Sequence, residues 1–197
     1  MALAYSKITL EIKEIFLKNR PKELYAISPK GTVPVLCLSK SIIIEESLDI
    51  MKWALEQYDI ESWFSSNINN QLEIVALCDN KFKYWLDRYK YHDRYPENTK
   101  IYYMEKCDMF LSEINNLLNI NPYLFSSKIS LADVAIFPFI RQYANVDKIN
   151  FENKYIYLSK WLDDFVNSKL FLSVMDKYPE YNSMQKPLII NFSKLGY

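Results

Sequence analysis

The sequence is poor in the residues that build metal centres and disulfide frameworks. Its 197 residues include 3 cysteines and 1 histidine. The cysteines, Cys37, Cys78 and Cys107, are odd in number and lack paired spacing, so we expect no disulfide framework and no metal site, and we interpret them as buried thiols. The single histidine, His92, offers little material for a metal site or a Ser-His-Asp triad, and we expect it at the surface.

The sequence also lacks an excess of either charge and any long apolar run. Lysine plus arginine number 24, and so do aspartate plus glutamate, so no whole-chain field attracts the protein to nucleic acid or anionic lipid. No stretch approaches 18 uncharged apolar residues, and the first residues lack the regions of a signal peptide. We therefore expect a soluble cytoplasmic protein with no nucleic-acid or membrane partner.

The first part of the chain has mixed secondary-structure signals. Alternating apolar residues predict a strand over 8–16, and a proline-led start predicts a short helix over 22–27. Two β-rich runs, 35–38 and 41–45, are separated by two polar residues and predict a hairpin. A helical spacing of apolar residues begins at Ser47.

After Asp59 the patterns are helical, and we expect no further strand. A polar, turn-rich segment, 65–70, marks a boundary. We therefore predict an α/β domain over 1–60 and an all-helical domain over 68–197. The expected helices of the second domain cover 72–91, 100–118, a buried segment after Ser130 that contains Pro138, 156–166 and 170–178.

One helix start carries a structural capping signal. In Ser130-Leu-Ala-Asp133 the serine hydroxyl is placed to meet the backbone N–H of Asp133, and the carboxylate is placed to reach back. We interpret this pair as a capping box with a structural role.

Two neighbouring segments could hold a small zwitterionic peptide. Val33-Pro34 precedes a predicted strand; a cis bond there would leave the Val33 backbone groups free for a ligand, whereas an ordinary trans proline would serve only to start the strand. Ser47 is expected at the N-cap of the next helix, where its hydroxyl and the free N–H groups suit a carboxylate. The Glu46 carboxylate can accept a hydrogen bond from a charged amine, whereas a helix cap with a purely structural role would not need this carboxylate.

Three segments together resemble the signature segments of the cytosolic glutathione transferases, in particular bacterial, omega-like members. They are Pro29-Lys-Gly-Thr-Val-Pro-Val-Leu36, Glu46-Ser-Leu-Asp-Ile50 and Ser130-Leu-Ala-Asp-Val-Ala-Ile-Phe-Pro-Phe139. The resemblance spans nearly the whole chain. It implies a thioredoxin-like N-terminal domain, an all-helical C-terminal domain, glutathione as co-substrate and a homodimer.

The resemblance assigns binding roles to five residues. Val33 would give backbone hydrogen bonds to the cysteinyl part of glutathione, with Pro34 cis, and Glu46 and Ser47 would bind the γ-glutamyl end. Arg20 could hold the glycyl carboxylate through a charge-assisted bond, or could be a solvated charge.

A second substrate would lie near the helix over 72–91, where Tyr84, Arg88 and Tyr91 are candidates. The Arg88 cation could steady an anionic substrate or thiolate. The alternative is that these three residues provide packing and surface charge.

The resemblance also implies that the family's first strand and its catalytic residue precede Met1 and are not in this chain. Tyr5, near a helix end, and Cys37, expected in the core, are poor substitutes, so we assign no catalytic residue. We expect the N-terminal domain to be truncated and the chain to have little or no transferase activity. A start site placed too far downstream, a decayed gene and a shortened binding protein are the three explanations.

Two functions therefore remain open. The first is glutathione binding for conjugation or thiol–disulfide reduction of small electrophiles. The alternative is a non-enzymatic interaction protein on the same fold, such as a factor that resembles the stringent starvation proteins and binds RNA polymerase.

Overall fold

The computed structural model describes residues 1–64 and 67–194, which form two compact units. The first unit combines Met1–Asp59 with the chain from Lys169 onward, and the second covers Ile60–Ser168. The sequence-based division had placed the chain after Lys169 with the second unit. Ser65 and Ser66 of the expected polar boundary lie outside the described residues. Each unit is considered by itself.

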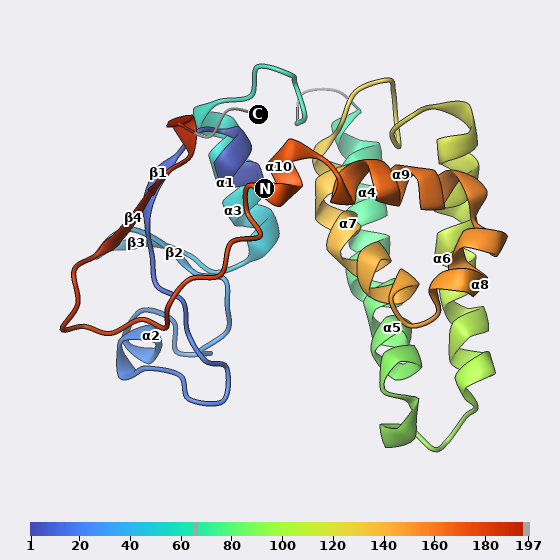
Figure 1. The fold of residues 1–197 in the computed structure, drawn as a ribbon, viewed down its shortest axis with the longest axis horizontal. Helices are drawn as coiled ribbons and strands as arrows, with labels where there is room; N and C mark the ends of the chain where they lie inside the picture. The colour runs from blue at the N-terminus through green and yellow to red at the C-terminus, as the bar shows by residue number, and fades with distance from the viewer. Residues whose placement is uncertain (65–66, 195–197) are drawn as a thin grey trace. The chain divides into compact units, whose positions relative to one another are not determined.

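The first unit holds short helices and two small sheets (Figure 1). Its elements are α1 (Ala2–Tyr5), β1 (Thr9–Ile12), α2 (Lys22–Ile27), β2 (Leu36–Ser39), β3 (Ile42–Ile44), α3 (Ser47–Gln57), α10 (Lys169–Leu172), β4 (Leu188–Asn191) and the 3-10 turn η3 (Phe192–Lys194). Helix α2 and the β2–β3 hairpin confirm the predicted order.

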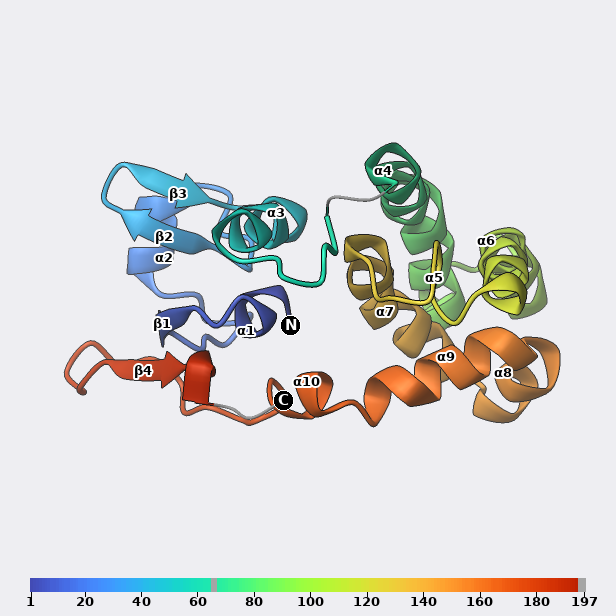
Figure 2. The same ribbon diagram turned by 90° about the horizontal axis from the view of Figure 1, so that it is seen from above.

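Strands β1 and β4 form one antiparallel pair, with Leu10 opposite Ile190 (Figure 2). Strand β1 is shorter than the strand predicted over 8–16, but its residues alternate between exposed and half-buried, as the apolar alternation predicted. The expectation of no strand after Asp59 is wrong, because β4 is a short apolar run whose pairing partner lies at the other end of the chain. The helix predicted over 170–178 is also shorter, since α10 ends at Leu172.

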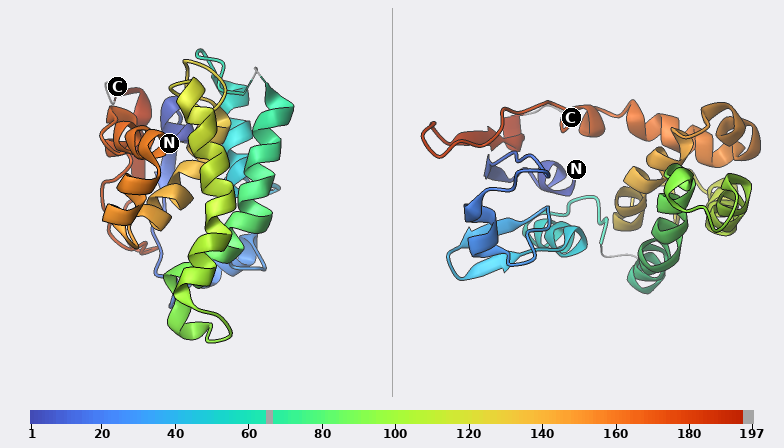
Figure 3. Two further views of the ribbon diagram at one scale, coloured as in Figure 1. Left: turned by 90° about the vertical axis from the view of Figure 1, so that its right-hand side faces the viewer. Right: turned by 90° about the horizontal axis from the view of Figure 1, so that it is seen from below.

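Every element of secondary structure in the described part of the second unit is a helix, and loops such as 121–130 connect them (Figure 3). Its elements are α4 (Ile68–Leu77), η1 (Cys78–Phe82), α5 (Lys83–Lys90), η2 (His92–Arg94), α6 (Lys100–Ile120), α7 (Leu131–Ala144), α8 (Lys148–Lys154) and α9 (Ile156–Val166). Elements α4, η1 and α5 run on without a break and form the helix predicted over 72–91. The central η1 is a π-helix, a wider turn that the apolar spacing did not reveal.

Most of the buried core belongs to the second unit, whose residues include all of the largest fully buried side chains. The apolar face predicted for α6 is buried, and Phe110 stacks on Phe82 with ring centroids 4.7 Å apart. The first unit has a thinner core and leaves Phe16, Leu17 and Ile42 more than half exposed. Within the described part of the chain, no helix is both long and apolar enough to span a membrane.

Candidate functional site

The β2–β3 hairpin brings the two predicted binding segments to the same end of a sheet. Leu36 pairs with Ile44, and the chain turns at Lys40 and Ser41 at the far end of the hairpin. Val33-Pro34 enters β2 from the open end, and Glu46-Ser47 leaves β3 at that same end. If the register continued beyond Leu36, Pro34 would lie opposite Glu46.

The loop before β2 presents Val33 to solvent. The Val33-Pro34 peptide bond is cis, as predicted, and Val33 is 44% exposed. Its backbone N–H and C=O make no hydrogen bond with any described residue. Gly31 shapes this loop with a φ of +63°, and the Tyr25 ring lies where a Gly31 side chain would go.

Helix α3 begins at Ser47, and its N-cap residue is Glu46. The prediction that Ser47 is the N-cap is therefore wrong by one residue, because the Glu46 carbonyl already accepts the first helical bond, from Ile50 N–H at 3.0 Å. The N–H groups of the first helical turn remain open to an anion. The side chains of Glu46 and Ser47 are exposed and have no partner among the described residues.

Arg20 lies just before Pro21, the N-cap residue of α2, whereas the Val33 loop follows the other end of that helix. Its side chain is exposed and has no hydrogen-bond or ion-pair partner among the described residues. The guanidinium is therefore available to a ligand carboxylate.

A buried serine that no local pattern in the sequence indicated joins the two predicted binding segments. The Ser28 hydroxyl donates to Glu45 Oε1 at 2.5 Å, and Ser28 is completely buried. Ser28 starts the loop that carries Val33, and Glu45 directly precedes Glu46. The two residues are 17 positions apart in sequence, and no local periodicity links them.

The predicted substrate-cleft residues belong to the second unit. The Arg88 guanidinium lies over the rings of two tyrosines, 3.5 Å from the ring centroid of Tyr84 and 4.5 Å from that of Tyr95. Arg88 Nε also lies 3.9 Å from Glu97. Tyr91 is placed differently, since its ring receives the guanidinium of Arg94 at 4.5 Å. Neighbouring side chains thus already contact the Arg88 cation, as in the packing alternative.

The remaining candidates have structural settings. Ser130 and Asp133 form the predicted capping box at the start of α7. The Tyr5 hydroxyl is engaged with Asp59 at 3.2 Å, and Tyr5 is buried. Cys37 is exposed, which corrects the expectation of a core thiol, because both faces of β2 reach solvent over Cys37–Ser39. Among the described residues, no group of three or more histidine, cysteine or acidic side chains could hold a metal ion.

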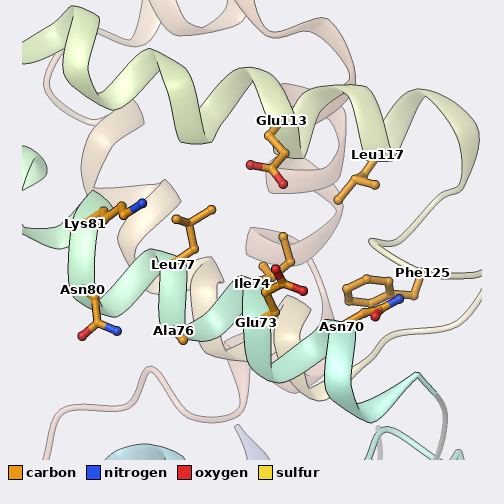
Figure 4. A pocket seen from close by; sticks show the side chains of 10 residues that line it. All are labelled: Asn70, Glu73, Ile74, Ala76, Leu77, Asn80, Lys81, Glu113, Leu117 and Phe125. Carbon is orange, nitrogen blue, oxygen red and sulfur yellow. The ribbon is translucent and has the colours of Figure 1, made fainter.

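A groove of about 540 Å³ lies in the second unit, apart from the predicted site residues (Figure 4). Leu77 of α4 and Leu117 of α6 line it, together with two carboxylates, Glu73 and Glu113. Neither carboxylate has an ion-pair partner among the described residues.

Two family models match the chain. The model described as glutathione S-transferase, N-terminal domain, matches residues 1–57, and the model of the C-terminal domain of the same family matches residues 80–181. No relative among the curated proteins matches the chain.

Solved structures share the fold. A glutathione transferase from Phanerochaete chrysosporium, URE2P6, in complex with oxidized glutathione is 17% identical with a TM-score of 0.73, and 88% of this chain covers 86% of it. One from Methylobacillus flagellatus with glutathione bound is 17% identical with a TM-score of 0.72, over 87% and 90% of the two chains. BphK, a bacterial transferase in a ternary complex, is 16% identical with a TM-score of 0.72, over 87% and 88%.

Proposed function

The chain belongs to the glutathione S-transferase family, and on this premise we propose that its first unit binds glutathione. The Val33 backbone would pair with the cysteinyl part of the peptide beside Pro34. Glu46 and Ser47 would hold the γ-glutamyl end, and Arg20 would pair with the glycyl carboxylate.

One observation carries this proposal: the Val33 backbone and the side chains of Glu46 and Ser47 all lie at the open end of the β2–β3 hairpin, and none of them has a hydrogen-bond partner among the described residues. The start of α3 offers free N–H groups and a serine hydroxyl to a carboxylate, and Glu46 adds an acceptor for an amine. An α-amino acid head group carries both charges on one carbon, so it matches this pair. The open backbone of Val33 adds the hydrogen bonds that an extended peptide seeks.

Two structural neighbours support the ligand, because their structures contain oxidized and reduced glutathione. We extend this ligand to the present chain on the residues named above. We further propose a cytoplasmic homodimer whose type of chemistry is directed at a small electrophile or disulfide, with Tyr84, Arg88 and Tyr91 as candidates for contact with that second substrate. Because we assign no catalytic residue, we expect little or no turnover from residues 1–197. In conjugation the glutathione thiol would lose its proton to water and its sulfur would bond to the electrophilic carbon, which releases its leaving group where it carries one. In reduction the glutathione thiolate would attack the substrate disulfide, so that the substrate S–S bond breaks as a mixed disulfide forms, and a second glutathione would then release the product as oxidized glutathione forms.

Calorimetric titration with reduced glutathione tests the proposal. Glu46→Gln should weaken binding about tenfold, because a charge-assisted bond to the amine becomes a neutral one. Glu56→Gln is a matched control, since Glu56 is also exposed and belongs to the same helix but lies near its other end. It should bind within twofold of the wild type. Absence of binding by the wild-type chain, or equal losses in the two variants, would rule out the assigned site.

The alternative function, an interaction protein on the same fold, is favoured by one observation. The first unit exposes Phe16, Leu17 and Ile42, and exposed apolar side chains of this size suit a protein partner. This alternative predicts no glutathione binding together with direct binding to purified RNA polymerase. Replacement of Phe16 and Leu17 by serine should abolish that binding, whereas it should leave glutathione titration unchanged if the leading proposal holds.

A further inference from the structure

We propose that Ser28 is a positioning residue that holds the two halves of the glutathione site in register; this inference rests on the proposed function. Among the described residues its hydrogen bonds go to Leu24, Gly31 and Glu45, none of which is assigned a ligand contact. Ser28 acts through three hydrogen bonds, which connect it to α2, to the Val33 loop and to Glu45.

The backbone of Ser28 fixes the start of the Val33 loop. Its N–H donates to the Leu24 carbonyl at 2.8 Å and closes α2, and its carbonyl accepts from Gly31 N–H at 2.8 Å and forms the turn that follows. The loop is therefore anchored to the helix at one end and folded back at Gly31 before it reaches Val33.

The side chain of Ser28 reaches the other half of the site. Its hydroxyl donates to Glu45 Oε1, and Glu45 is followed directly by the proposed binding residues Glu46 and Ser47. The β2–β3 ladder ends at Leu36 and Ile44. Beyond that pair, no other hydrogen bond among the described residues joins 28–35 to 45–47.

Burial strengthens the hydrogen bond between Ser28 and Glu45. Ser28 is 0% exposed, so water cannot compete at the hydroxyl, and a carboxylate acceptor makes the bond stronger than one between neutral groups. A ligand that must contact Val33 and Glu46 at once binds more tightly when the protein already fixes their spacing, because less ordering accompanies binding. Loss of the bond should therefore lower affinity without removal of any ligand contact.

Titration with reduced glutathione tests the inference. Ser28→Ala should weaken binding about tenfold. Glu45→Ala breaks the same hydrogen bond from a half-buried side chain and should weaken binding equally, so it tests the inference even if Ser28→Ala fails to fold. Glu45→Gln should bind within threefold of wild type, because its amide oxygen still accepts from Ser28. The double variant Ser28→Ala/Glu45→Ala should be no weaker than either single one.

Ser6→Ala is the matched control. Ser6 is a buried serine of the same unit whose hydroxyl donates to the Tyr58 carbonyl at 2.9 Å, at the other end of α3. It should lose stability as Ser28→Ala does, yet bind glutathione within twofold of the wild type. If Ser6→Ala weakens binding equally, or Ser28→Ala binds as tightly as wild type, the positioning role is overturned while glutathione binding stands. If the wild-type chain does not bind, the proposed function fails first and the role falls with it.

Discussion

Trp161 donates its indole N–H to Asp133 Oδ1 across 2.9 Å, and this bond joins the start of α7 to the middle of α9. Asp133 is completely buried, and its carboxylate also accepts from the backbone N–H groups of Leu124 and Ser130 and from the Ser130 hydroxyl. Burial raises the pKa of Asp133, and these donors limit the rise. The Asp133 carboxylate thus accepts hydrogen bonds from the N-cap of α7, from the loop at Leu124 and from α9.

We expect Asp133→Ala to lower the free energy of unfolding by about 3 kcal/mol or more, because several buried N–H groups lose their acceptor at once. Ser130→Ala removes the cap hydroxyl but leaves the carboxylate in place, so its cost should be about 1 kcal/mol. Urea denaturation followed by tryptophan fluorescence measures both. Equal losses in the two variants would show that the carboxylate does no more than cap the helix.

A second polar group in the same unit lies buried without good hydrogen bonding. The Tyr143 hydroxyl is close to Tyr155, yet it makes no well-aligned hydrogen bond. The Tyr155 hydroxyl, in contrast, donates to Asp108, which also receives Lys154. Burial raises the pKa of both tyrosines.

This difference predicts that replacement by phenylalanine will affect stability differently at the two positions. Tyr143→Phe removes a buried hydroxyl that has no good partner, so stability should stay within about 0.5 kcal/mol of wild type or rise. Tyr155→Phe leaves Asp108 with one donor fewer and should cost about 1–3 kcal/mol. Thermal unfolding of the two variants compares them directly, and a larger loss from Tyr143→Phe would mean that its hydroxyl is bonded in solution.

Local signals in the sequence predicted much of this fold. Helix α2, the hairpin and α6 each follow from periodicity or turn residues within a single short window, and the capping box of Ser130 and Asp133 follows from their spacing. The proposed binding segments around Val33 and Glu46 were predicted because several residue types suited to one ligand occur together.

Contacts between distant parts of the chain could not be predicted in this way. Strand β4 gains its partner from residues near the other end of the chain, and the Ser28–Glu45 bond has no periodic signature. The exposure of Cys37 arises because both faces of β2 reach solvent over Cys37–Ser39, whereas a residue pattern that is apolar on both faces predicts burial. The N-cap of α3 is Glu46, one residue before the predicted Ser47, because the backbone of either residue can adopt the N-cap conformation.

The three cysteines should differ in their reactivity toward thiol reagents. Burial raises the pKa of Cys78 to about 12 and raises that of Cys107, whereas Cys37 is exposed. Because the thiolate is the reactive form, a chromogenic disulfide reagent at pH 8 should modify Cys37 in the folded chain and all three thiols after unfolding. Cys37→Ser should remove the fast reaction, and rapid modification of a second thiol would contradict the burial of Cys78 and Cys107.

Truncation after Tyr178 should loosen the first unit and spare the second. It removes β4, the partner of β1, together with the bond from Tyr181 N–H to the Glu14 carbonyl at 2.7 Å. Amide exchange over 9–12 should accelerate about tenfold or more, because an unpaired edge strand exposes its N–H groups, while the amides of α6 keep their protection. Met184→Ala in the full chain is the control, since Met184 is 94% exposed and contributes no pairing. Unchanged exchange over 9–12 would mean that β1 is held by its other neighbours, and equal acceleration in α6 would mean that the two units unfold together. Faster exchange over 9–12 with unchanged exchange in α6 is expected, because the removed residues stabilise the unit to which β4 belongs.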